Sequence, residues 1–377
     1  MKMKKTLMDG NQAAAWGARL SRVQVFPNFP ITPATEITEV LADWKAEKKW
    51  NGEWLNLESE HSVLSAAISS EATGARTFTA SSSQGLMLMS EMHYVASGMR
   101  LPIVMVNCSR ALAAPISLWS DHNDIMALKN AGWLMFFAKN NQEVLDSIIQ
   151  AYKISENRNV LLPSIINMDG FILSFTNEPT EIPDQKKVDK FLPKYNPKVF
   201  LDVNKPMSLG VPVMEGYMNF RAQVHKAQLN ALKVIKDVGK EYGKMFGRKY
   251  DTVEKYRTDD AKVIFVSVGA HSTTIEAAVD SLRKEKIKAG LLRLRTLRPF
   301  PKDDIKKVIG GCENVAVIDN NISPGFGGNI YSDICSVVDR KNVANFIVAL
   351  GGKHIGRKDF ENMAKKALKD KKIFWNF

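Results

Sequence analysis

An apolar run, LPIVMVNCS at 101–109, constrains the fold more than any other feature of this chain. Its first six residues are apolar without interruption and are rich in β-branched side chains. A continuous run of this kind is typical of a strand that is buried on both faces of a parallel sheet. Such a strand needs helices on both faces, so the run predicts an α/β fold.

Segments with strand or helix periodicity alternate around this run: strands at 76–83 and 160–170, helices at 85–99 and 141–157. This order predicts a doubly wound α/β domain. In such domains the loops at the carboxyl ends of the strands carry the functional site. We therefore expect the site in the loops Ser81–Gln84 and Ser109–Asp124.

A chain of 377 residues is too long for one ordinary core, and a second α/β pattern, with a turn at Gly269, appears late in it. We expect two domains, 1–247 and a smaller one at 256–377. The first domain includes a segment rich in Pro, Asn and Asp at 176–221, which we expect to be irregular. Residues 248–261 are interpreted as a linker.

The net charge of +12 raises the question of nucleic-acid binding. The lysines are spread along helical stretches, so solvated faces or acidic partner proteins explain them better, and no nucleic acid is expected. No apolar run is long enough to cross a membrane. Asp9 and its polar neighbours interrupt the apolar stretch that a signal peptide would need. Asp9 is expected to cap a helix instead.

Three cysteines, Cys108, Cys312 and Cys335, lie far apart and form no CxxC motif. This pattern argues against a disulfide framework and against an iron–sulfur cluster on this chain. A reducing cytoplasmic location is expected.

Three motifs have competing interpretations. PGFGGN at 324–329 could hold an anion before a helix, but a tight turn is the better interpretation. SDHND offers Asp121, His122 and Asp124 either as metal ligands or as acceptors for loop backbone groups, and no metal site is assigned to them. SSSQG at 81–85 lacks the GxSxG pattern of a nucleophile elbow.

Pro30, Thr32 and Pro33 form a stiff, extended turn, because proline fixes φ and restricts the residue before it. The turn holds the Thr32 hydroxyl in place. In NLESEHS, Glu60 starts a helix of small residues, where it is either a helix-terminal acid or a functional one. Arg110 follows the buried strand and could hold a carboxylate or form a structural ion pair.

The segments FPITPATEI, LESEHS, TFTASSSQGLMLM, SRALAAPISLWSDHNDIM and RLRTLRPFP occur in this order. Together they resemble the α subunits of pyruvate:ferredoxin oxidoreductases, within the thiamine-diphosphate 2-oxoacid:ferredoxin oxidoreductase family. The resemblance covers nearly the whole chain. It implies a pyrimidine-binding-type thiamine domain followed by a smaller domain similar to the C-terminal domain of transketolases.

The resemblance also implies roles for single residues. Thr32 would present its hydroxyl to the 2-oxoacid, and Arg110 would face the substrate carboxylate. Glu60 would contact N1′ of the aminopyrimidine ring and activate the cofactor, with Glu58 as the alternative if the register differs. Pro30 is assigned with Glu60 to the cofactor side.

Family members hold the diphosphate through Mg²⁺ with a GDG motif, which is missing from this sequence. The resemblance therefore implies that a β subunit supplies the Mg²⁺ and diphosphate half of a shared site. It also implies γ and δ subunits, with [4Fe–4S] clusters on β and δ, and the use of CoA and ferredoxin through the whole complex. An isolated chain is expected to be inactive.

Pyruvate is the favoured substrate, with CoA-dependent oxidative decarboxylation to acetyl-CoA as the reaction. The arginine loop reads SRALAAP rather than the RGGPS of 2-oxoglutarate relatives, and Thr32 stands where oxalate relatives carry arginine. A related 2-oxoacid (2-oxoglutarate, a branched-chain 2-oxoacid or oxalate) is the alternative. A non-catalytic scaffold subunit is a second alternative of a different class.

Overall fold

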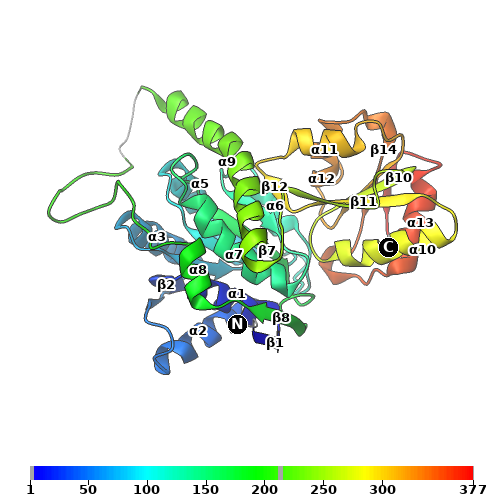
Figure 1. Ribbon diagram of the computed structural model, residues 1–377. Coiled ribbons are helices and arrows are strands. Elements are labelled where there is room, and N and C mark those ends of the chain that lie inside the picture. The colour runs from blue at the N-terminus through cyan, green and yellow to red at the C-terminus, as the bar shows by residue number, and fades with distance from the viewer. Residues whose placement is uncertain (1–3, 211–214, 377) are drawn as a thin grey trace.

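The computed structural model describes residues 4–210 and 215–376 and shows two α/β units side by side (Figure 1). The first is built on a five-stranded sheet of order β12-β6-β7-β5-β4. The second is built on a six-stranded sheet of order β15-β14-β13-β10-β11-β9. Parallel pairs dominate both sheets, which confirms the predicted fold class.

The strands of the first sheet are β4 (Phe78–Ser81), β5 (Val104–Ser109), β6 (Leu134–Phe137), β7 (Ser164–Asp169) and β12 (Thr296–Arg298). Every residue of β5 is buried, as its apolar sequence predicts. β12 pairs antiparallel with β6, although its neighbours in sequence belong to the second unit. The second unit is therefore joined to the first sheet by a strand as well as by side-chain packing.

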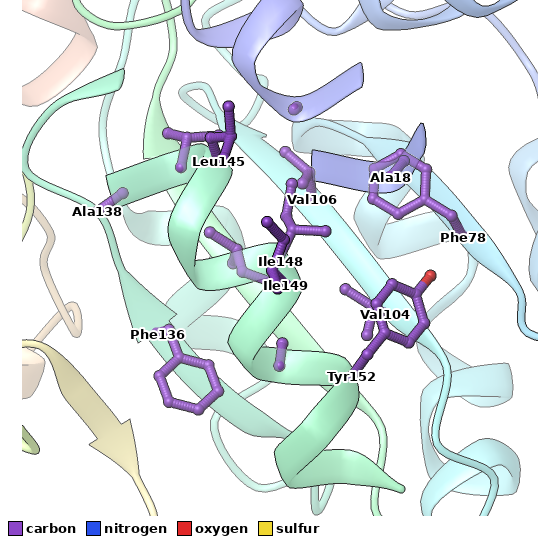
Figure 2. Packing of buried hydrophobic residues seen from close by; sticks show 14 of the residues in the cluster. Ala18, Phe78, Val104, Val106, Phe136, Ala138, Leu145, Ile148, Ile149 and Tyr152 are labelled. Carbon is purple, nitrogen blue, oxygen red and sulfur yellow. The ribbon is translucent and has the colours of Figure 1, made fainter. Parts of the chain in front are cut away.

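Helices cover both faces of this sheet. They are α1 (Gly10–Leu20), α2 (Thr35–Ala46), α3 (Glu60–Ala72), α4 (Ser83–Leu88), α5 (Ser90–Gly98), α6 (Asn123–Ala127), α7 (Asn141–Ser155) and α9 (Tyr217–Phe246). On one face, Ile148 and Ile149 of α7 pack against Val106 of β5 and towards α1 (Figure 2). Asp9 caps α1 by accepting a hydrogen bond from the Gln12 amide, as predicted.

Two interpretations of the sequence were wrong. The segment 176–221 is not wholly irregular, because it contains β8 (Glu178–Ile182) and α8 (Gln185–Phe191). β8 pairs with an unpredicted N-terminal strand, β1 (Lys4–Met8). The supposed linker at 248–261 contains β9 (Val253–Tyr256), which completes the second sheet. In each case a short strand is stabilised by a distant partner, which local sequence does not reveal.

The second sheet contains β10 (Val263–Ser267), β11 (Ala289–Leu294), β13 (Val315–Asp319), β14 (Val343–Ile347), β15 (Ile373–Trp375) and β9. Its helices are α10 (His271–Lys284), α11 (Lys302–Ile309), α12 (Asn329–Cys335) and α13 (Arg357–Ala367), with short 3-10 turns at Arg340–Asn342 and Leu350–Gly352. α10 and α13 share one apolar cluster. Another cluster contains residues of both units, among them Met105 and Ile264, so the two units share buried surface.

A small parallel sheet of β2 (Val25–Asn28) and β3 (Glu53–Asn56) leads into the proline–threonine turn and into α3. In the part of the chain that the structure describes, no helix is both long and apolar enough to span a membrane.

Candidate functional site

Two loops meet where β4 and β5 end. The strands are parallel neighbours, with Ser81 paired to Asn107, so the chain leaves both strands at the same edge of the sheet. The first connection is short and leads through Ser82 into α4, whose first residues are Ser83 and Gln84, and the second loop begins at Arg110. This is where the sequence predicted the functional loops to lie.

The Arg110 guanidinium connects this edge to the proline–threonine turn. Its Nη1 donates to the Thr32 carbonyl at 2.6 Å, and its Nη2 donates to Gln84 Oε1 at 2.6 Å. These bonds use two of the five guanidinium N–H groups, and the buried Nε has no partner within the described chain. The two hydrogen bonds therefore fix the orientation of the Arg110 guanidinium, and its Nε–H group makes no hydrogen bond in the described chain. Thr32 itself is exposed.

Glu60 is the first residue of α3, where Ser59 caps the helix by accepting from the Ser62 amide. Its side chain is only 8% exposed, and no described group hydrogen-bonds to its carboxylate. The carboxylate lies against Gly85, so closely that a β-carbon there would be 2.4 Å from Glu60 Oε1. The start of a helix favours a negative charge, which reduces the cost of burying this one.

Glu58, the alternative acid, has a different environment. It is exposed, and the Ser62 hydroxyl donates to its carboxylate and lowers its pKa. Pro30 is exposed at the end of β2, two residues before Thr32. Thr32 and Arg110 are thus in direct contact, and Glu60 is near enough to Arg110 for their charges to interact.

Charges around Arg110 keep its guanidinium ionised. Burial lowers the pKa of Arg110, and the negative charges of Asp124 and Glu60 oppose this shift. Burial likewise raises the pKa of Asp124 to about 6, although hydrogen bonds from the Arg110 and Ser83 amides oppose it. This corner of the sheet therefore places two buried acidic side chains, Asp124 and Glu60, close enough to Arg110 for their charges to interact with it.

Gln84 and Gly85 were not singled out from the sequence. Gln84 binds Arg110, and Gly85 leaves room for the Glu60 carboxylate. The one available signal for Gly85 was a glycine in the first position of the expected helix at 85–99, since glycine is a poor helix former and its use there calls for a reason.

The side chains of the SDHND motif make hydrogen bonds within the protein, and in the described chain no group of three or more His, Cys, Asp or Glu side chains is placed to hold a metal ion. His122 Nε2 hydrogen-bonds Asp169 Oδ1 at 2.5 Å, and Asp169 Oδ2 accepts from the Ala270 amide at 2.7 Å. Burial alone would lower the pKa of His122, but Asp169 raises it overall.

Loops at the carboxyl ends of three strands of the second sheet hold this segment. The Ala270 amide follows β10 and bonds to Asp169, which binds His122. After β13, the Asn320 carbonyl accepts from the His122 amide at 2.7 Å, and the Ile322 amide donates to the Asn123 side chain. After β14, the Gly351 amide donates to Asp121 at 3.3 Å.

PGFGGN forms a tight turn, as preferred over an anion site. Ser323 and Gly327 pair across the turn as an isolated antiparallel β-bridge, and the helix that follows, α12, has only seven residues. The buried Asp319 carboxylate already accepts from the amides of Ile330 and Tyr331 at the start of α12.

A cavity of about 930 Å³ lies elsewhere, beside β2 and α8, and is lined by residues such as Trp50, Arg76 and Tyr195. It includes none of Thr32, Glu60 or Arg110.

Three polar groups at the corner of the sheet make no hydrogen bond within the described chain. They are the buried Ser81 hydroxyl, the buried Arg110 Nε and the Glu60 carboxylate. A buried carboxylate with no hydrogen-bond partner in the described chain can accept or donate at a ring nitrogen of an aminopyrimidine, so the residues present suit the pyrimidine side of thiamine diphosphate. A buried arginine fork with free N–H groups suits a carboxylate.

Two family models match most of the chain. Residues 16–240 match the family described as pyruvate flavodoxin/ferredoxin oxidoreductase, thiamine diphosphate-binding, and residues 261–360 match pyruvate:ferredoxin oxidoreductase core domain II. The pyruvate synthase subunit PorA of Methanocaldococcus jannaschii is 46% identical over 98% of this chain and 97% of its own length. The PorA protein of Methanothermobacter thermautotrophicus is 43% identical, covering 96% and 94%.

The ketoisovalerate oxidoreductase subunit VorA of Pyrococcus horikoshii is 40% identical over 98% of this chain and 97% of its own. Among solved structures, a 2-oxoglutarate:ferredoxin oxidoreductase from Magnetococcus marinus has a TM-score of 0.76 at 19% identity, covering 97% of this chain and 66% of that one. A split-gene transketolase has a TM-score of 0.53 at 11% identity, covering 95% and 97%. These two structures are similar to this chain in fold.

Proposed function

Because the chain belongs to the pyruvate flavodoxin/ferredoxin oxidoreductase family, we propose that it is the α subunit of a pyruvate:ferredoxin oxidoreductase. The complete enzyme converts pyruvate and CoA reversibly to acetyl-CoA and CO₂ and passes electrons to ferredoxin. Pyruvate is favoured because the PorA relatives, at 46% and 43% identity, are pyruvate synthase subunits. The observation that carries the proposal is the buried, unpartnered Glu60 carboxylate beside the fixed Arg110.

In this proposal the chain supplies the pyrimidine side of the site. Glu60 would hold the aminopyrimidine ring of thiamine diphosphate at its N1′ nitrogen and would hold or release a proton there, with Pro30 on the same side of the cofactor. Thiamine diphosphate, when bound, supplies the electron sink for decarboxylation. Arg110 would face the carboxylate of the 2-oxoacid, and Thr32 would present its hydroxyl to the same substrate.

A second subunit completes this site. The sequence has no GDG motif, so Mg²⁺ and the diphosphate belong to a β subunit, and the [4Fe–4S] clusters belong to β and δ, with γ completing the complex. Exposed apolar side chains surround the corner of the sheet: Leu88 on α4, and Ile116, Leu118 and Trp119 on the loop that begins at Arg110. Exposed apolar groups of this kind are typical of protein interfaces.

The division into domains 1–247 and 256–377 is part of this proposal, with the first domain carrying the site residues. The cytoplasmic location expected from the scattered cysteines also stays a prediction.

Glu60→Gln in the complete complex tests the proposal. Glutamine keeps the shape of the side chain but has no carboxyl group that can take up or release a proton, so we expect kcat to fall by about 10²-fold or more. Glu58→Gln is the matched control, because Glu58 lies two residues away and is exposed, and it should leave kcat within about twofold of wild type.

Normal turnover of an intact Glu60→Gln complex would show that the chain is a scaffold. A loss of turnover confined to Glu58→Gln would instead make Glu58 the activating acid. A panel of 2-oxoacids, including ketoisovalerate and 2-oxoglutarate, identifies the substrate by the ratios of kcat/KM. Isolated chain should bind thiamine diphosphate only after the β subunit and Mg²⁺ are added.

A further inference from the structure

The Asp124 carboxylate lies between the two loops of the site. Its Oδ2 accepts from the Ser83 amide at 3.1 Å, from the Arg110 amide at 3.1 Å and from Asn107 Nδ2 at 3.2 Å. The side chain is completely buried. We propose that Asp124 is a positioning residue that fixes the direction of the Arg110 guanidinium and thereby sets the affinity for the 2-oxoacid. This inference rests on the proposed function of Arg110.

Asp124 fixes Arg110 from both ends. One hydrogen bond holds the backbone of Arg110 itself, where the side chain starts. The bond to Ser83 holds the backbone that carries Gln84, and Gln84 Oε1 receives the far end of the guanidinium at 2.6 Å. A single carboxylate oxygen therefore joins the start of the arginine side chain to the acceptor at its tip.

The loop needs this anchor because Ser83 has a positive φ of 48°. Non-glycine residues seldom adopt this conformation and keep it only when their surroundings impose it. The Asp124 bond to the Ser83 amide is one such restraint, and the Ser83 hydroxyl bond to the Ala111 carbonyl at 2.7 Å is another. Both restraints connect the Gln84 loop to the Arg110 loop.

Asparagine cannot replace Asp124 without loss. Oδ1 accepts from the Ile125 amide at 2.7 Å, while Oδ2 accepts the three bonds described above. An asparagine side chain has one oxygen and one NH₂ group. In one amide orientation the NH₂ group faces the Ile125 amide, and in the other it faces the three donors at Oδ2, so at least one hydrogen bond is replaced by two donors that face each other. The substitution also removes a negative charge beside Arg110.

The experiment measures pyruvate oxidation by the complete complex with Asp124→Asn. We expect KM for pyruvate to rise at least about tenfold, with kcat within about threefold of wild type, as for a lost ground-state binding interaction. Asp146→Asn is the matched control. Asp146 is also completely buried and accepts several hydrogen bonds, but from residues far from the site, among them Gln142 of α7, Tyr242 of α9 and Tyr250. Its substitution should reduce thermal stability and leave KM unchanged.

A double variant separates positioning from general damage. If Asp124 acts through Arg110, Asp124→Asn combined with Arg110→Lys raises KM no further than Arg110→Lys alone. Multiplying KM effects, or a fall in kcat with unchanged KM, would overturn the inference while leaving the role of Arg110 intact. An unchanged KM in Arg110→Lys would overturn the substrate role of Arg110 and this inference with it.

If the Asp124→Asn complex does not assemble, Gln84→Met provides the same test. It removes the acceptor at the tip of Arg110, which the Asp124 bond to Ser83 places there. KM should rise again with kcat nearly unchanged, and an unchanged KM would overturn the inference.

Discussion

Gly85→Ala should inactivate the enzyme without unfolding it. Gly85 lies in α4, and a β-carbon there would be 2.4 Å from Glu60 Oε1 and 2.7 Å from Ser81 Oγ. Ordinary contact starts at 3.4 Å, so the Glu60 carboxylate must withdraw by about 1 Å. The backbone itself tolerates alanine, since the φ of Gly85 is not positive, and alanine favours a helix by up to about 1 kcal/mol over glycine.

The expected effect follows from that displacement. A catalytic group misplaced by about 1 Å costs roughly 10²-fold in rate, so kcat for pyruvate oxidation should fall by about this factor. The melting temperature should stay within a few degrees of wild type, because steric cost and helix propensity offset each other. The assay is steady-state turnover of the complete complex, with thermal unfolding of the same preparation.

Gly98→Ala is the matched control, because Gly98 also lies in a helix and a β-carbon there would meet nothing within 4 Å. It should leave kcat unchanged. Gly85→Ala added to Glu60→Gln should cost little more than Glu60→Gln alone, since both changes act on one carboxylate. Full activity of Gly85→Ala, or multiplying effects in the double variant, would refute the catalytic role of Glu60.

Three further predictions concern stability. Burial raises the pKa of Glu71 to about 8 from its ordinary 4.5. Between these values the folded chain holds a proton on Glu71 that the unfolded chain has lost, so the free energy of unfolding should fall as the pH rises from about 5 to 8. Glu71→Gln should remove that slope in melting temperatures, and an unchanged slope would contradict the assignment. Gly17→Ala would place a β-carbon 2.9 Å from Ile148 at the contact of α1 with α7. In urea unfolding this overpacking should lower the free energy of unfolding by about 1–3 kcal/mol, and the higher helix propensity of alanine should restore up to about 1 kcal/mol of that loss. Asp169→Asn leaves His122 without its carboxylate, and we expect a loss of about 3–5 kcal/mol in unfolding free energy; wild-type stability would show that this buried pair does not stabilise the fold.

The sequence predicted the elements whose own pattern is strong. The apolar run at 101–109 became β5, and the turn at Gly269, which has a φ of 66°, leads into α10 as expected. β12 could not be predicted, because three residues at 296–298 become a strand only by pairing with β6 from the other unit. Its place depends on tertiary packing, which outweighs local propensity in short strands.

In the candidate site, too, the position of the loops was predicted from the sequence, but the contacts between them were not. The loops after β4 and β5 were expected from the α/β pattern, since parallel neighbours end at one edge. The contact of Asp124 with Ser83 and Arg110 was not predicted, because a carboxylate in SDHND suits either a metal or backbone amides. Only the positions of both loops in space decide between these partners.

The loops of the second sheet that hold Asp121, His122 and Asn123 have a mechanical consequence. These residues directly precede Asp124, so a rotation of the smaller unit would be transmitted along a few covalent bonds to the arginine loop. The orientation of the smaller unit and the position of the arginine loop are therefore coupled. If Arg110 binds the 2-oxoacid as proposed, a partner that binds the smaller unit would also change the affinity for this substrate.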